Sequence, residues 1–163
     1  MRPIQKVSLA CCTLFIFGCA TGKNFITPKT ISSDKATIYL YKPKALFGAA
    51  GYFDINITNK NNQTIQKGRL ENGGFLKFIL KENIYNIHTQ LDIPDDMFLA
   101  SFVKNHTNYI SKTIKITPSN KTITCYKFRI KNIGINSATA YIENINTKQC
   151  LHDLKGTKES EYF

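Results

Sequence analysis

Apolar and polar residues alternate with a period of two along most of this chain, and this pattern constrains the fold more than any other feature. Residues 52–58, for example, place Phe53, Ile55 and Ile57 on one face and polar side chains on the other. Such alternation is typical of a β-strand with one buried face. Similar segments recur at roughly ten-residue intervals between turn signals, which predicts an all-β fold, an antiparallel β-sandwich of the Ig-like or transthyretin-like kind.

The strands and turns can be placed approximately. The expected strands cover residues 36–41, 52–58, 64–70, 75–80, 84–91, 109–117, 121–131 and 138–145. In the seventh of these, Tyr126, Phe128 and Ile130 are expected to face inward. The Asn-Gly-Gly sequence at 72–74 tolerates positive φ and predicts a hairpin turn.

Residues 92–105 interrupt the alternation. Pro94, Asp95 and Asp96 suit the first turn of a short helix, but an apolar loop fits as well. The apolar residues of this segment either pack against an open end of the sheet or dip into a membrane or a partner. A short helical turn is also expected at 147–154.

The N-terminus has the layout of a secretory signal. Arg2 and Lys6 precede an apolar run over residues 7–17, and Gly18 and Cys19 close it. The run is shorter than the roughly 20 residues that a spanning helix needs, which favours cleavage over retention. The closing residues resemble the lipobox of bacterial lipoproteins. That resemblance implies cleavage before Cys19 and a lipid on its sulfur.

Lipidation of Cys19 would fasten the chain to a membrane without spanning it. Each buried methylene contributes about 0.8 kcal/mol, so two or more acyl chains, such as palmitate, anchor a protein stably. Ala20 follows the cysteine where some lipoproteins carry Asp, which resembles the outer-membrane default of Gram-negative lipoproteins. The predicted location is therefore the cell envelope, on the periplasmic face of the outer membrane.

The chain divides into four parts on this reading. Residues 1–18 are the signal peptide, and the polar, aperiodic residues 19–33 predict a lipidated cysteine on a flexible tether. Residues 34–155 contain the sandwich, which has the size of a single domain. Residues 156–163 form a polar tail.

The charge is strongly basic, with 22 Lys and Arg against 11 Asp and Glu, a net charge of +11. Loss of Arg2 and Lys6 on cleavage would leave 20 basic residues against 11 acidic ones, a net charge of +9. Such a balance suits an anionic surface. The lysines are spread along polar strand faces without a dense run, so we expect no nucleic-acid partner.

Two cysteines remain in the predicted domain. Cys125 and Cys150 form an even pair in an exported chain, where disulfides form. A bond would close a loop of ~25 residues and contribute on the order of 3 kcal/mol. Two buried thiols and a metal pair are the alternatives. Because His88, His106 and His152 lack ligand spacing to either cysteine, we expect no metal, and no cofactor beyond the lipid.

Tyr39 and Tyr41 have two interpretations. They could form an exposed aromatic patch that binds a glycan or a peptide. They could instead pack within the sheet with their hydroxyl groups at its rim, as the β propensity of tyrosine suggests.

No catalytic pattern stands out. Asp92, Asp95 and Asp96 suit a helix start. His152 and Asp153 are neighbours in sequence and lack the nucleophile of a triad. The chain has no nucleophile elbow, zinc-protease motif or phosphate-binding loop. The prediction is a protein that is not an enzyme.

Several short motifs resemble the DUF2846 family of bacterial lipoproteins. The opening KATIYLYKP at 35–43, the FDI at 53–55, the LENGGF at 70–75 and residues 78–87 carry the likeness. The NKTITCYKF at 120–128 is a looser match, without the family's glycine or first tyrosine. The resemblance implies a fold class and an envelope location, and it implies no activity.

These features predict a membrane-anchored envelope lipoprotein that serves as a non-enzymatic binding or assembly module for an envelope protein. One alternative is an accessory lipoprotein of a secretion machine, similar in plan to the small tethered sandwiches of type VI secretion. Another is a cell-envelope hydrolase. The partner and the oligomeric state are not encoded in any recognisable motif.

Overall fold

The computed structural model of the protein describes residues 19–30, 33–45, 51–92, 111–134 and 137–163. The predicted signal peptide at 1–18 lies outside the described residues, and so does nearly all of the apolar segment at 92–105. The structure therefore bears on the domain and on the chain that leads into it.

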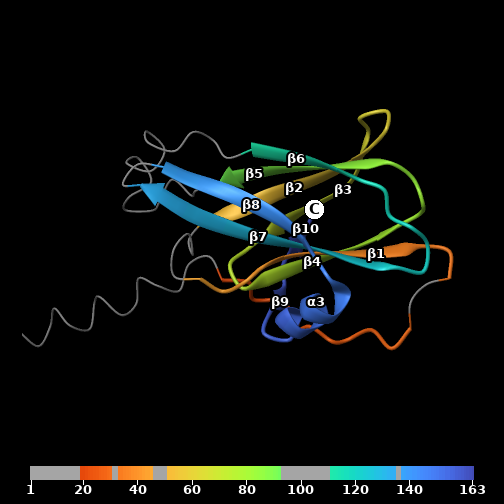
Figure 1. The fold of residues 1–163 in the computed structure, drawn as a ribbon, viewed down its shortest axis with the longest axis horizontal. Helices are drawn as coiled ribbons and strands as arrows, with labels where there is room; N and C mark the ends of the chain where they lie inside the picture. Colours follow the sequence, from red (N-terminus) through yellow and green to blue (C-terminus); the bar gives the residue numbers. More distant parts are fainter. Residues whose placement is uncertain (1–18, 31–32, 46–50, 93–110, 135–136) are drawn as a thin grey trace, which may run out of the picture.

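Two five-stranded sheets pack face to face (Figure 1). The first sheet contains, in spatial order, β8 (Ser137–Ile145), β7 (Ile123–Gly134), β1 (Ala36–Lys42), β4 (Gly74–Leu80) and β9 (Lys158–Glu159). The second contains β10 (Glu161–Tyr162), β3 (Thr64–Leu70), β2 (Tyr52–Asn59), β5 (Tyr85–Asp92) and β6 (Ser111–Ile116). The predicted all-β sandwich is confirmed.

The first sheet is mixed, which the expectation of purely antiparallel sheets did not include. β1 pairs in parallel with β7, and β4 pairs in parallel with β9. Parallel neighbours need a long connection between them. Between β1 and β7 the connection contains β4 of the first sheet and four strands of the second sheet, β2, β3, β5 and β6.

The core between the sheets follows the alternation in the sequence. Phe53, Ile55 and Ile57 are all buried on the inner face of β2, as predicted. Phe128 of β7 is also buried, and Tyr126 and Ile130 are partly buried against the same core. The named residues of β2 and β7 therefore face the opposite sheet, whereas Cys125 of β7 belongs to a separate cluster on the outer face of the first sheet.

The turn at 72–74 does not make the predicted hairpin. Gly73 has the expected positive φ of 70°, but β3 belongs to the second sheet and β4 to the first. The chain crosses between the sheets here, so Leu70 and Leu76 enter one core from opposite sides and both are fully buried. Turn chemistry specifies the turn and leaves open which sheet each flanking strand joins.

A second, smaller apolar cluster lies on the outer face of the first sheet. Helix α3 (Thr147–Leu154) covers this face, and its position confirms the predicted helical turn. The buried members of the cluster are Phe25, Tyr39, Tyr41, Phe75, Cys125, Cys150 and Leu154. We call this set the outer cluster.

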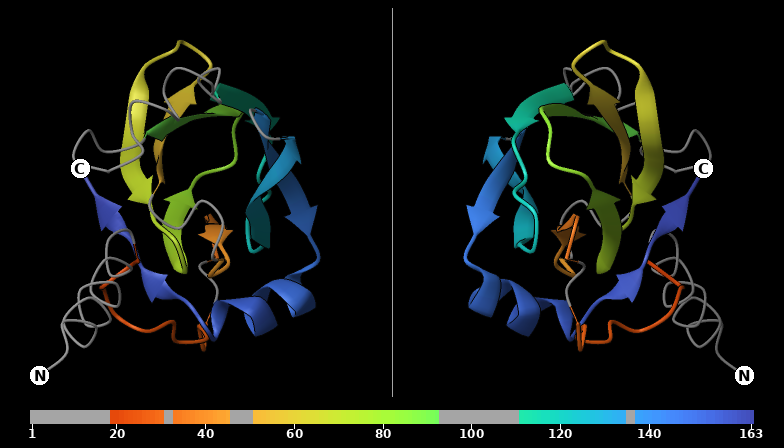
Figure 2. Two further views of the ribbon diagram at one scale, coloured as in Figure 1. Left: turned by 90° about the vertical axis from the view of Figure 1, so that its left-hand side faces the viewer. Right: turned by 90° about the vertical axis from the view of Figure 1, so that its right-hand side faces the viewer.

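The C-terminal segment joins the two sheets along one side. β9 pairs with β4 of the first sheet, and β10 pairs with β3 of the second. Figure 2 shows the two short strands running from the level of α3 up to the C-terminus. Thr157 and Ser160 are buried, which differs from the expectation of a polar tail outside the domain.

Candidate functional site

Cys19, the predicted lipidation site, lies against the sandwich. It forms a β-bridge with Asn72, and the backbone N–H of Ala20 donates to the carbonyl oxygen of Asn72 at 3.0 Å. The side-chain amide nitrogen of Asn72 is 3.9 Å from the sulfur of Cys19. Cys19 is half-buried and Ala20 is buried, so the residue that would carry the lipid is held at the turn between β3 and β4.

Asn72 organises this end of the molecule. Its side chain is buried and makes two hydrogen bonds with Ala45, donating to the carbonyl oxygen and accepting from the N–H, each at 3.0 Å. The side-chain amide of Asn72 therefore connects the chain that follows β1 to the turn at 72–74, with which Cys19 pairs. The sequence predicts Asn72 as a turn residue, and no local pattern indicates that its side chain also binds Ala45.

Lys42 is a buried cation beside the same turn. Its ammonium group donates to the carbonyl oxygen of Gly51 at 2.9 Å and lies 5.7 Å from the ring centroid of Phe53. Burial lowers the pKa of Lys42 to about 8, and a smaller interaction with Cys19 opposes the shift. Lys42 follows Ile38 and Leu40 on the inner face of β1, so it caps the core at this end.

The chain after Cys19 runs along the domain. The ring of Phe25 packs edge-on against Tyr39 at 5.6 Å and against Phe75 at 5.5 Å between centroids. The carbonyl oxygen of Lys23 accepts a 2.7 Å hydrogen bond from the N–H of Glu159. This differs from the expectation of a flexible tether over 19–33, because Phe25 finds an apolar surface that the polar composition of the segment did not reveal.

Tyr39 and Tyr41 do not form an exposed aromatic patch. Tyr39 is 1% exposed and Tyr41 is fully buried, beneath Phe25 and α3 respectively. Of the two interpretations, packing is right and the binding patch is wrong. The outward-facing side chains of β1 are covered because α3 and the N-terminal segment form a third layer on this sheet.

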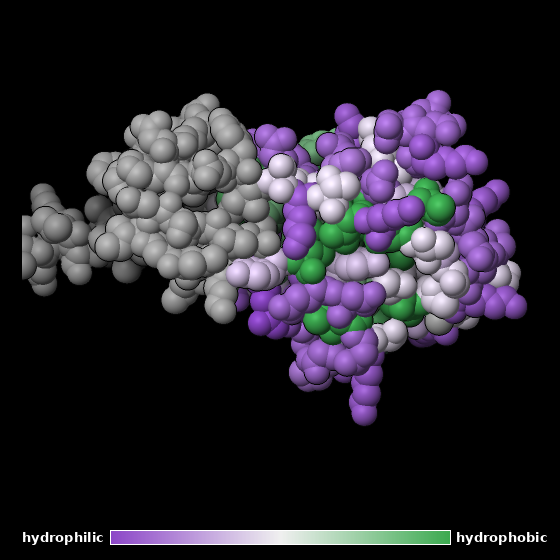
Figure 3. Space-filling view, turned by 45° about the horizontal axis from the view of Figure 1, so that its top comes forward, coloured by the Kyte–Doolittle hydropathy of each residue, from purple (hydrophilic) through white to green (hydrophobic). Residues whose placement is uncertain are grey.

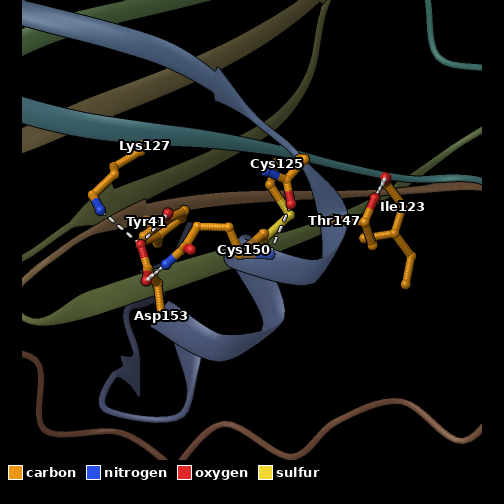
Figure 4. Close-up of a disulfide and its surroundings, with 9 residues drawn as sticks. Tyr41, Ile123, Cys125, Lys127, Thr147, Cys150 and Asp153 are labelled. Carbon is orange, nitrogen blue, oxygen red and sulfur yellow. Dashed lines mark hydrogen bonds and ion pairs between the residues drawn. A yellow bond between two sulfur atoms is a disulfide. The ribbon is translucent and has the colours of Figure 1, made fainter.

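A disulfide joins Cys125 of β7 to Cys150 of α3, with the two Cα atoms 6.1 Å apart (Figure 4). The predicted pairing is confirmed. Asn146 caps the helix, and its side chain accepts from the N–H of Gln149 at 2.9 Å. The bond pins α3 to the outer face of the first sheet.

Asp153 adds a polar attachment to the same helix. Its carboxylate accepts from Lys127 at 2.6 Å, from Tyr41 at 2.8 Å and from Gln149 at 2.6 Å. Burial alone would raise the pKa of Asp153, but these hydrogen bonds outweigh it and lower the pKa to about 2. Burial and the Asp153 hydrogen bond raise the pKa of Tyr41. The carboxylate thus stays charged and locks α3 to two strands.

The chemistry around this network is structural. His152 is largely exposed, with a ring nitrogen 3.8 Å from Asp153, whose carboxylate is already bonded to Lys127 and Tyr41. No group of three or more His, Cys, Asp or Glu that could hold a metal occurs within the described ranges. We assign Asp153 to the packing of α3.

A hollow of about 310 Å³ lies beside the chain that follows β1, lined by Lys42, Pro43, Ala45, Lys127, Phe128, Arg129 and Ile130. Its outer cations have acidic partners, because Lys127 binds Asp153 and Arg129 lies 3.6 Å from Glu143. We assign no ligand to it.

Comparison with known proteins adds no family. No family model matches this sequence, and no curated protein matches it. The likeness to DUF2846 lipoproteins stays a prediction. In the part of the chain that the structure describes, no helix is long and apolar enough to cross a membrane.

Proposed function

We propose that this protein is a lipid-anchored protein of a bacterial cell envelope and acts there as a non-enzymatic binding or assembly module. The observation that carries the proposal is the sequence from Arg2 to Cys19: cations, a short apolar run, a small residue and a cysteine. A signal of this kind directs export. Acyl chains on Cys19 would then hold the mature chain on the membrane.

The disulfide supports an exported protein. Bonds of this kind persist in oxidising compartments such as the periplasm and are rare in the cytosol. Cys125 and Cys150 are both fully buried, and their bond joins strand β7 to helix α3. Cys19 is the one free cysteine within the described residues, and it is half-buried at one end of the sandwich.

The side of the sandwich away from the C-terminal strands is the surface that best fits a binding module. Among the described strands, β6 and β8 are the outermost on this side of their sheets. Ile114 and Ile142 from these strands are only partly buried against the core. Figure 3 looks down over β6, and apolar patches appear there between hydrophilic side chains. Edge strands and apolar patches are common sites of protein association.

Metabolic labelling tests the anchor. Cells fed an alkyne-tagged fatty acid should label the wild-type protein and should not label Cys19→Ser. A Cys125→Ser/Cys150→Ser double variant is the matched control and should keep the label, because those sulfurs are not acylated. Absence of label on the wild-type protein would overturn the proposal.

Crosslinking in intact cells tests whether the protein binds a partner through the side that carries β6 and β8. Wild-type protein should capture a discrete envelope partner, and charge substitutions at the partly buried Ile114 and Ile142 should reduce the yield. Undiminished capture by both variants would exclude the β6 and β8 side as the binding surface.

A further inference from the structure

We propose that the domain sits directly on the bilayer, with the end of the sandwich that carries Cys19 in contact with lipid headgroups. This inference rests on the proposed lipidation and goes beyond it, because a lipid anchor on a flexible tether would leave the domain free in position and orientation. The surface involved is the Cys19 end, defined by Cys19, Lys44, Ala45 and the turn at 72–74.

The first step of the argument is the attachment of the anchor residue. The hydrogen bond from Ala20 to Asn72 uses no atom that precedes Cys19, so the mature chain would retain it. Adjacent β-paired segments lie about 5 Å apart. If residues 19–33 were free, those 15 residues could extend about 50 Å from the membrane. The pairing of Cys19 with Asn72 prevents this extension, so the turn at 72–74 lies about 5 Å from the residue that would carry the lipid.

The strand directions define which end of the sandwich this is. The register places the end of β1 at Lys42 opposite Gly74, and the end of β3 at Leu70 opposite Phe53. The opposite end holds the β2–β3 turn with Lys60 and the β4–β5 turn. β2 spans on the order of 25 Å between the two ends. Figure 1 shows the sandwich with its strands running across this length.

The side chains at the Cys19 end suit a headgroup surface without requiring a specific lipid. Lys44 is exposed and lies beside Gly73, since a Cβ on that glycine would stand 3.5 Å from the Cβ of Lys44. Lys23 is also exposed, whereas Glu71 next to the turn is acidic. The local charge is therefore mixed. The covalent anchor sets the contact, and the lysines add attraction to anionic phospholipids.

Burial of the anchor segment makes the attachment firm. Ala20 and Phe25 are both buried, and Phe25 contacts the outer cluster. Releasing Cys19 from the turn would require exposing at least Ala20. The domain and its anchor are therefore expected to move as one body.

Energy transfer from tryptophan tests the orientation, because the natural chain has no Trp. Full-length protein purified from membranes with Lys44→Trp or Lys60→Trp would be reconstituted in phosphatidylethanolamine–phosphatidylglycerol vesicles with a dansyl-labelled headgroup. Both lysines are exposed, so neither change disturbs the core. We expect transfer several-fold stronger from position 44 than from position 60.

A linker variant supplies the control. Inserting about ten Gly and Ser residues between Cys19 and Ala20 keeps the lipid and the Ala20 contacts but restores slack. Transfer from Lys44→Trp should fall in this variant, and the difference from Lys60→Trp should shrink. Equal transfer from both positions, or no effect of the linker, in protein shown by mass spectrometry to carry lipid would overturn this inference and leave the anchor intact. Protein without lipid would overturn both proposals.

Discussion

The two sheets share one core but differ on their outer faces. Outside the first sheet, Tyr39, Tyr41 and Cys125 are buried beneath α3 and the N-terminal segment. Outside the second sheet, Asp54 and His88 are partly exposed; Asp54 lies within ion-pair distance of Arg69, and His88 forms a hydrogen bond with Thr113. The extra layer on the first sheet is built from α3 and from the irregular N-terminal segment that starts at the proposed lipid site. The difference shows that the segment after Cys19 and the covered face form one structural unit.

The largest effect should come from the shared core. Ile55→Asn would bury an unpaired amide and lose apolar contacts, so it should lower the free energy of unfolding by about 3–4 kcal/mol. The matched change Asn56→Ala, on the outer face of the same strand, should cost less than about 1 kcal/mol. Urea denaturation measures both. Similar losses would show that the two faces of β2 are not distinct.

The next effect concerns the attachment of the covered face. Replacing Cys125 and Cys150 with Ala should cost on the order of 3 kcal/mol, because the bond closes a long loop in the unfolded chain. Cys19→Ser serves as the control and should change stability by less than about 0.5 kcal/mol. Unchanged urea midpoints for the double variant would mean that packing and the Asp153 contacts hold α3 without a contribution from the disulfide.

A smaller, pH-dependent effect should come from Asp153. Its pKa of about 2 lies below the ordinary value of 3.8. The folded chain therefore binds this proton less tightly than the unfolded chain, so the stabilisation is present above pH 3.8 and is lost as the pH falls toward 2. Asp153→Asn should lower the free energy of unfolding at neutral pH by about 1–2 kcal/mol. It should also reduce the loss of stability that the wild-type protein shows as the pH falls from 3.8 toward 2. Melting curves between these pH values measure it, and parallel curves for the two proteins would contradict the assignment.

The smallest effect should come from the exposed face. Arg69 lies 3.9 Å from the ring centroid of Tyr52, and its Nε is 3.5 Å from Asp54. Partly exposed pairs of this kind contribute about 0.5–1 kcal/mol. Arg69→Met keeps the apolar stem, so its cost should stay within that range and should shrink in high salt. A loss as large as that of the disulfide would show that the outer face of the second sheet is also a structural layer.

The period-two pattern predicted much of the fold. It placed Ile55 and Phe128 in the core. The alternation ends after the strand at 138–145, and the helical turn predicted next is α3. Turn chemistry at Gly73 predicted the turn but not the crossing between sheets, because φ preferences are local and sheet membership depends on distant pairings. The even pair of cysteines predicted the disulfide, because disulfides form between paired cysteines in the oxidising compartment that the N-terminal signal predicts.

The covered face could not be predicted from the same patterns. Alternation shows that Tyr39 and Tyr41 face away from Ile38, but it does not show what lies there. Phe25 is a single aromatic residue in a polar segment, and only its contacts with Tyr39 and Phe75 make it a core residue. Asn72 and Asp153 act through partners far away in sequence, which no local spacing reveals.

The mass of the intact native protein, extracted from membranes in detergent, tests the central claim most directly. We predict a chain that begins at Cys19, carries the added mass of acyl chains and is two hydrogens lighter for the bond between Cys125 and Cys150. An unmodified chain of 18.5 kDa that still includes residues 1–18 would contradict the account.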